Sequence, residues 1–271
     1  MTGIFRITDM AQKTEKRAKE ILQLLLHQGK TSVEQLAEHF QTSATSVRRD
    51  LARLEQQRLV HRTRGGAMLA GQVYEPFRFD ATFTEREKRF QREKHLIAAK
   101  AATLIVDGDT IGLTAGTTTT QVARALRGRK TVRVLTNAVN IGLELSSAED
   151  PKTTLTGGCM MWPGAFSLTG PTALETIEGF VLDRILLGVT GIDIEHGATM
   201  IELEEAAVSR AMVRQAREVV VVADSSKVGM TGRAVICGIQ KINLLVTDSG
   251  IPEDAKEELK RHGVRLLIVD V

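Results

Sequence analysis

The chain has 271 residues, of which 42% are hydrophobic and 25% charged, and its 36 Lys and Arg against 33 Asp and Glu give a net charge of +3. This composition is typical of a globular protein with about two domains and argues against disorder. Apolar runs fall far short of the roughly 20 residues that cross a bilayer, and the N-terminus lacks an apolar signal core. We therefore expect a cytoplasmic protein with no membrane partner.

The first strongly patterned region predicts a three-helix unit. Apolar residues recur at helical spacing over 14–28, which predicts the first helix. Thr31, with Glu34 three residues later, predicts a capping box for a second helix over 32–40. A short turn then ends at Ser43, which can cap the third helix.

The third helix has the features of a DNA recognition helix. Val47, Leu51 and Leu54 predict its buried side, which leaves several arginines facing outward. Arginine binds guanine through paired hydrogen bonds and phosphate through charge. A basic segment with the pair Gly65–Gly66 follows and is typical of the hairpin, or wing, of a winged helix-turn-helix. The residues expected to contact duplex DNA are Ser43, Thr45, Ser46, Arg48, Arg49, Arg53, Arg62 and Arg64.

The charge distribution supports this interpretation over a solvated basic helix face. Residues 1–70 carry 12 Lys and Arg against 7 Asp and Glu, a net of +5, whereas the remainder carries 24 against 26, a net of −2. A basic head on a mildly acidic body indicates nucleic-acid binding by one domain only.

The stretch RRDLARLEQQRLVHRTRGGA, which begins at Arg48, resembles the signature of the DeoR-type bacterial transcriptional repressors. That family usually has a valine before the serine of the turn, and a threonine-isoleucine pair before its arginines. This chain has Thr42, Ser46 and Val47 at these positions, which are changes that affect sequence preference rather than fold.

Residues 71–91 are predicted to be a linker between a DNA-binding domain over 1–70 and a second domain over 92–271. The periodicity lapses there, and Pro76 interrupts the chain. The segment nevertheless holds five aromatic residues, and exposed rings are unfavourable by roughly 25 cal/mol per Å² of apolar surface. We therefore expect it to pack, either against the second domain or, as the less favoured alternative, against another subunit. The aromatic residues are Tyr74, Phe77, Phe79, Phe83 and Phe90.

From residue 92 onward, predicted helices alternate with short apolar strands. This order is typical of an open, Rossmann-like α/β fold whose parallel sheet is covered on both faces. The predicted helices span 95–104, 119–126, 138–146 and 204–215, and a further one begins at Pro252. The predicted strands span 110–113, 132–135, a stretch around Leu155, 185–189, 219–222, 244–246 and 264–269.

Small, hydroxylated and glycine residues follow several of these strands, at the edge where such sheets bind ligands. Gly116 lets the backbone approach a ligand, and the threonines after it open a helix whose first amides suit a phosphate. Asp224 and Lys227 follow another strand. We therefore predict a pocket for a small anionic polyol.

In this order the residues resemble the DeoR-type sensor domain, which is similar in fold to ribose-5-phosphate isomerase and the coenzyme A transferases. The resemblance implies that Asp224 and Lys227 face the sugar of a sugar phosphate. It implies that the phosphate is held by Gly116, Thr117, Thr118 and Thr119, and that the site is bordered by Thr136, Asn137, Gly157 and Gly158. The family usually has an aspartate where this chain has Thr114, so a strong acceptor for sugar hydroxyls is missing.

Other candidate groups have ordinary explanations. Glu204 and Glu205 open a helix, where acidic side chains favour the dipole in any case, and Asp193 lies in a turn-like stretch. Trp162 could form a lid or simply pack. Cys159 and Cys237, the only cysteines, lack metal-ligand spacing, so no metal is expected. We expect no cofactor, because neither a GxGxxG nor a P-loop pattern is present.

We thus expect a ligand-responsive repressor that forms a homo-oligomer, a dimer or a tetramer, and holds adjacent half-sites of an operator. A sugar phosphate in the second domain would weaken operator binding to the extent that it prefers the non-binding conformation. The alternative is an isomerase-like enzyme with an attached DNA-binding domain, since a lysine and carboxylates can perform acid-base chemistry. No residue pair has the sequence context of a dedicated catalytic dyad.

Overall fold

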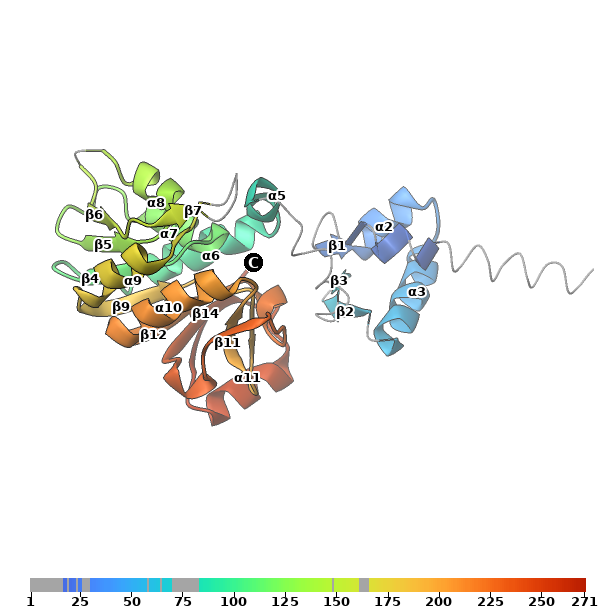
Figure 1. Cartoon of the computed structure of the whole chain (residues 1–271). Coiled ribbons are helices and arrows are strands. Elements are labelled where there is room, and N and C mark those ends of the chain that lie inside the picture. The colour runs from blue at the N-terminus through green and yellow to red at the C-terminus, as the bar shows by residue number, and fades with distance from the viewer. Residues whose placement is uncertain are drawn as a thin grey trace, which may run out of the picture. The chain divides into compact units, whose positions relative to one another are not determined.

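A computed structural model of the protein describes residues 17–18, 20–22, 24–25, 30–57, 59–63, 65–69, 83–147, 149–160 and 166–271. The chain divides into two compact units, Met1–Ala81 and Thr82–Val271 (Figure 1). No helix among the described residues is both long and apolar enough to cross a membrane.

The first unit is a winged helix-turn-helix, as predicted. Its described elements are β1 (Lys30–Ser32), α2 (Val33–His39), α3 (Ala44–Gln56), β2 (Val60–Thr63) and β3 (Gly66–Leu69). The strands form an antiparallel sheet in the order β1-β3-β2, and Gly65 makes the β2–β3 turn with φ of 88°. The described residues between 17 and 25 are helical, and Ile21 and Leu25 are buried with Leu36, Val47 and Leu51.

The predicted cap of α2 was wrong by one residue. Ser32, not Thr31, is the N-cap: its hydroxyl accepts the amide of Gln35 at 3.1 Å, while Gln35 Oε1 accepts the Ser32 amide at 2.9 Å. Thr31 instead lies in β1, where it pairs with Ala67 and is only 3% exposed. Both residue pairs have capping-box spacing, and the short strand, which the sequence did not reveal, decides between them.

The second unit is built on a seven-stranded sheet in the order β15-β14-β12-β9-β4-β5-β6, in which every pairing is parallel. This confirms the predicted α/β fold with a parallel sheet. In chain order the strands are β4 (Thr110–Leu113), β5 (Arg133–Thr136), β6 (Lys152–Leu155), β9 (Leu182–Leu187), β12 (Ala216–Val222), β14 (Leu244–Asp248) and β15 (Arg265–Val269). The order reverses between β4 and β9, which is the switch point where such sheets bind ligands.

Two hydrophobic clusters cover the faces of this sheet. One face packs against α6 (Gln91–Ala102), α7 (Thr117–Ala125) and α8 (Val139–Glu144). The other face packs against α9 (Pro171–Glu178), α10 (Leu203–Gln215) and α11 (Glu253–Arg261). Along β9, Ile185 and Leu187 enter the second cluster and Leu186 the first, as strand alternation requires.

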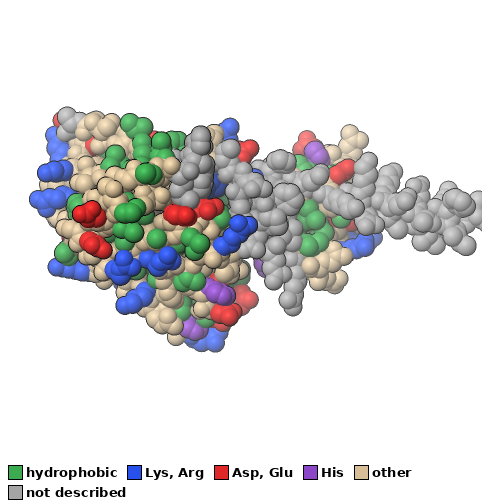
Figure 2. Space-filling view, viewed as in Figure 1, with side chains coloured by type: hydrophobic (Ala, Val, Ile, Leu, Met, Phe, Trp, Pro, Cys, Tyr) green, Lys and Arg blue, Asp and Glu red, His purple; other side chains and the backbone are tan. Residues whose placement is uncertain are grey.

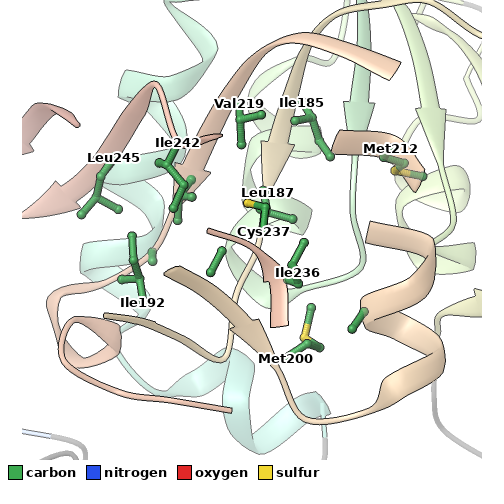
Figure 3. Close-up of a cluster of buried hydrophobic side chains, with 14 of the residues drawn as sticks. Ile185, Leu187, Ile192, Met200, Met212, Val219, Ile236, Cys237, Ile242 and Leu245 are labelled. Atoms are coloured by element: carbon green, nitrogen blue, oxygen red, sulfur yellow. The ribbon is translucent and has the colours of Figure 1, made fainter. Parts of the chain in front are cut away.

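Several elements of the second unit were missed. α9 is one of them, and a small antiparallel sheet of β10 (Gly191–Asp193), β11 (Gly197–Met200) and β13 (Ala234–Cys237) is another. Ile192, Met200 and Ile236 of this small sheet meet side chains of the main sheet and of α10 (Figure 3). The remaining short elements are β7 (Cys159–Met160), β8 (Leu168–Thr169) and the 3-10 turns η1 (Ser225–Lys227) and η2 (Ile239–Lys241).

The described part of the expected linker is ordered against the second unit. Phe83–Lys88 form a helix, α5, and the Phe83 ring meets the Phe166 ring edge-to-face with centroids 4.9 Å apart. The packing expected of an aromatic segment is therefore seen at Phe83. Tyr74, Pro76, Phe77 and Phe79 lie outside the described residues.

Candidate DNA-binding and effector sites

Helix α3 presents the predicted recognition surface. Its N-cap Ser43 accepts the amide of Ser46 at 3.2 Å, and the two hydroxyls lie 3.0 Å apart. Val47, Leu51 and Leu54 are buried, whereas the side chains of Thr45, Arg48, Arg49 and Arg53 are exposed. The helix therefore has a free basic face, and Ser43 and Ser46 are already engaged in starting it.

Asp50, which the sequence analysis did not single out, fixes α3 within the first unit. It is 5% exposed, and its Oδ2 lies 2.7 Å from Arg17 Nε of the first helix. Breaking a buried pair leaves an uncompensated charge, so this contact holds the recognition helix against its neighbour.

In the described part of the wing, Arg62 is paired rather than free. The amide of Arg62 donates to Glu55 Oε1 at 3.1 Å, and its guanidinium lies 3.6 Å from Glu55 Oε2. Because both side chains are well exposed, at 47% and 42%, this pair is weak and a phosphate could displace it. Arg64 lies outside the described residues.

At the switch point of the large sheet, the N-terminus of α7 forms the phosphate-binding candidate. Gly116 is the N-cap, and its carbonyl accepts the hydroxyls of Thr119 and Thr120 at 3.0 and 2.7 Å and the Thr120 amide at 3.0 Å. The amides of Thr117, Thr118 and Thr119 precede the first intrahelical bond, so they remain available to an anion. Among the described residues, no hydrogen bond engages the hydroxyl of Thr117 or Thr118.

Thr136 and Asn137 lie at this edge but are occupied by internal bonds. The Thr136 hydroxyl donates to the Leu113 carbonyl at 2.7 Å and accepts the Ala138 amide at 3.1 Å. Asn137 Oδ1 accepts the Ala115 amide at 3.1 Å, and its Nδ2 donates to the Leu168 carbonyl at 3.2 Å. Both side chains are almost fully buried, so they shape the loop before α7.

Thr114 has a comparable internal role. It is 1% exposed, and its hydroxyl accepts the Gly188 amide at 2.9 Å, which joins the ends of β4 and β9. The residue at the family's usual aspartate position therefore ties the two strands of the switch point together.

Gly157 and Gly158 are explained by backbone geometry. Their φ angles are 70° and 110°, in the region that favours glycine, and a Cβ on Gly158 would lie 2.3 Å from the Thr169 carbonyl oxygen. They allow the close approach of β7 to β8, with or without a ligand.

Among the described residues, Asp224 has the free polar atom that Thr136 and Asn137 lack. Asp224 is 1% exposed; its Oδ1 accepts the Ser226 hydroxyl, but among the described residues its buried Oδ2 has no hydrogen-bond partner. The Lys227 side chain is half-buried in η1. Strand β12 is two places from β4, so these residues lie about 10 Å along the sheet from the start of α7.

Two supporting residues were not predicted from the sequence. Asp248, at the end of β14, accepts the amides of Ser225 at 2.7 Å and Gly250 at 2.9 Å and so positions the loop that carries Asp224. Asn140 of α8 donates to the Thr120 hydroxyl at 2.8 Å. Asp248 follows a predicted strand, which was an available signal, whereas nothing local marks Asn140.

The remaining candidates that the structure describes form no site of their own. Glu205 accepts a hydrogen bond from Ser167, and Asp193 accepts the Thr231 hydroxyl at 2.7 Å and the His196 amide at 2.7 Å. In the described part of the chain no cluster of His, Cys, Asp and Glu could hold a metal. Acidic and basic side chains are interspersed on the visible face of the second unit (Figure 2). Trp162 lies outside the described residues.

Comparison with known proteins agrees with the two-part architecture. Residues 17–73 match the model of the DeoR-like helix-turn-helix domain, and residues 89–249 match that of the DeoR C terminal sensor domain. The chain is 36% identical to the HTH-type transcriptional repressor GlcR of Bacillus subtilis over 257 residues, covering 94% of this chain and 96% of that protein. It is 32% identical to the glycerol-3-phosphate regulon repressor of Escherichia coli over 254 residues, covering 94% and 98%. Among solved structures, ribose 5-phosphate isomerase A of Methanocaldococcus jannaschii matches at 19% identity and a TM-score of 0.38 over 51% of this chain and 55% of that one.

Proposed function

The chain belongs to the DeoR family of DNA-binding transcriptional regulators, and we propose that it represses genes of sugar metabolism until a sugar phosphate binds its second unit. The relatives from Bacillus subtilis and Escherichia coli are both named as repressors, and the chain matches them over nearly their whole lengths. The chain is therefore a regulator and not an isomerase-like enzyme. The relative named for glycerol-3-phosphate supports a small phosphorylated effector.

For DNA binding we propose that α3 enters the major groove. Arg48, Arg49 and Arg53 would read base edges and phosphates from its exposed face, and Thr45 would contact the backbone at its start. Arg62 and Arg64 of the wing are proposed phosphate contacts. Two such units in a dimer or tetramer would hold paired half-sites.

For effector binding, the observation that carries the proposal is the buried Oδ2 of Asp224, which has no hydrogen-bond partner in the described part of the chain and lies on the sheet edge that holds the N-terminus of α7. The α7 amides suit an anion, whereas the carboxylate oxygen of Asp224 suits a hydroxyl donor. Such opposite preferences, about 10 Å apart, match a molecule with a phosphate at one end and hydroxyls at the other. We propose that Thr117, Thr118 and Thr119 bind the phosphate.

A thermal-stability panel on the full chain tests this function. The compounds are D-ribose 5-phosphate, D-fructose 6-phosphate, D-glucose 6-phosphate and sn-glycerol 3-phosphate, with the free sugars, glycerol and inorganic phosphate as controls. A binding effector at 100 times its Kd should stabilise the chain by about 2.7 kcal/mol, and it should also weaken binding to a duplex selected from a random library.

Matched variants give the panel its controls. Lys227→Ala should lose the ligand-induced stabilisation and keep DNA binding. Lys152 is an exposed lysine at the N-terminal end of β6, on the sheet edge opposite to the candidate site, so Lys152→Ala should keep both properties. If no phosphorylated compound shifts the melting temperature, the effector half of the proposal is wrong. Product formation from a sugar phosphate would contradict the regulator assignment.

A further inference from the structure

Helix α7 joins the candidate effector site to the first described element after the inter-unit segment. Its N-terminus holds Thr117–Thr119, and near its C-terminus Arg124 Nη1 lies 2.8 Å from Glu87 Oε1 of α5. In sequence, α5 directly follows residues 70–82, which lead from the DNA-binding unit. One side chain therefore links the far end of the phosphate-binding helix to the start of the second unit.

Contacts at both ends of α7 favour its movement as a rigid body. At its first turn, Thr120 bonds the Gly116 carbonyl, and Asn140 of α8 bonds Thr120. At its last turn Arg124 Nη2 lies 2.7 Å from the carboxylate of Glu144, also on α8, and just beyond that turn Arg127 Nη2 lies 2.6 Å from the same carboxylate. Nine helical residues span about 13 Å, so a shift at the phosphate-binding end reaches Arg124 without being absorbed by the helix.

A second set of contacts reaches α5 from the same edge of the sheet. Asn137 holds the Ala115 amide before α7 and the Leu168 carbonyl, and the Phe166 carbonyl accepts the Val139 amide at 2.8 Å. The Phe166 ring then packs on Phe83, the first residue of α5. Each end of α5 thus contacts an element that borders the candidate effector site.

Helix α5 is also held at its C-terminal end by α6. The buried Lys94 Nζ of α6 donates to the carbonyls of Arg86 and Arg89, where α5 ends. A short helix of six residues held in this way moves as one piece rather than by unwinding.

We propose that Arg124 is a positioning residue that, through Glu87, couples the N-terminus of α7 (Gly116–Thr119) to α5 and thereby to the DNA-binding unit. The proposal rests on the proposed function, since it assigns a path by which effector binding changes DNA affinity. The side chains of Arg124 and Glu87 are 38% and 25% exposed, and an ion pair of this kind changes an equilibrium by up to about fivefold. The Phe83–Phe166 contact carries the remainder of the coupling.

The test uses the full chain, the selected duplex and the sugar phosphate that most raises its melting temperature. Glu87→Gln should keep the Kd for the duplex and for the sugar phosphate within about twofold, yet reduce the ligand-induced loss of DNA affinity by about fivefold. Glu87→Asp should restore most of the response. Arg127→Gln is the matched control, because Arg127 lies just beyond α7 and pairs with Glu144 of α8 rather than with α5, and it should respond as the unmodified chain does. A full response in Glu87→Gln would overturn the proposal.

A ligand-free arm separates this inference from the effector assignment. Thr119→Val removes the hydroxyl bond to Gly116 at the start of α7. In a double-mutant cycle on DNA affinity, the fold-change in Kd for Thr119→Val with Glu87→Gln should differ by twofold or more from the product of the two single fold-changes. The cycle of Thr119→Val with Arg127→Gln should show no such difference. Multiplicative effects in both cycles would refute the coupling. If no sugar phosphate binds, the proposed effector is wrong and this cycle still decides the role of Arg124.

Discussion

The Asn137→Ala variant separates a structural role for this side chain from direct ligand contact. Asn137 is 2% exposed and satisfies the Ala115 amide and the Leu168 carbonyl at 3.1 and 3.2 Å. Truncation leaves both backbone groups buried without a partner, at about 1–3 kcal/mol each, so we expect a destabilisation of about 2–6 kcal/mol. For a unit of this size, each kcal/mol lowers the melting temperature by roughly 2–4 °C.

Calorimetry of the ligand-free full chain measures this loss. Asn137→Asp keeps an acceptor for the Ala115 amide but sets a carboxylate oxygen against the Leu168 carbonyl, so it should retain only part of the stability. Asn140→Ala removes one hydrogen bond, to the Thr120 hydroxyl, and should lower the melting temperature by less than Asn137→Ala does. An unchanged melting temperature for Asn137→Ala in the absence of ligand would refute the structural role and favour direct contact of Asn137 with the ligand.

Four further outcomes are expected. Arg48→Ala or Arg49→Ala should weaken specific DNA binding by about 1–3 kcal/mol in an anisotropy titration, and unchanged affinity would contradict the assignment of α3. Glu55→Gln frees Arg62 from its 3.6 Å partner and should strengthen binding to random duplex DNA with a steeper salt dependence; a flat salt slope would argue against the wing contact. At pH 8 a thiol reagent should modify the exposed Cys159 and spare Cys237, because burial raises the pKa of Cys237 to about 11. The thiol of Cys237 ionises at a lower pH in the unfolded chain than in the folded one. Its contribution to stability should therefore be constant below about pH 8.5, and the free energy of unfolding should fall as pH rises from there toward 11. Cys237→Ser should remove this fall when melting is measured as a function of pH.

The elements that the sequence predicted well carry strong local patterns. The apolar run Val219–Val222 lies within β12, and the helix expected over 204–215 is α10, which begins one residue earlier. The sheet β10-β11-β13 could not be found in this way, because β11 pairs with a strand that begins more than thirty residues later, at Ala234. Helix α9 was missed although Gly170 and Pro171 mark its start, since its eight residues give a short periodic signal.

The same contrast between local patterns and long-range contacts applies to the residues of the candidate site. Hydroxyl and glycine residues at strand ends could be predicted, because strand ends are read from local patterns. Which hydroxyls are free could not, because the partner of Thr136 is the Leu113 carbonyl, 23 residues away. Thr136 and Thr117 look alike in sequence, yet one bonds the neighbouring strand and the other opens a helix.

Asp224 gives a physical reason why a polyol phosphate should bind better than phosphate alone. A buried oxygen without a partner is unfavourable, and among the described residues Asp224 Oδ2 has none. Inorganic phosphate bound at the α7 amides does not reach Asp224, whereas a hydroxyl of a sugar phosphate could also donate to Oδ2. A hydrogen bond to a charged group contributes about 1.5–3 kcal/mol, which corresponds to a preference of roughly tenfold to more than a hundredfold. With Thr114 engaged by Gly188, Asp224 becomes the carboxylate that makes this discrimination, so the effector should be chosen by its hydroxyls at the β12 end and held by its phosphate at α7.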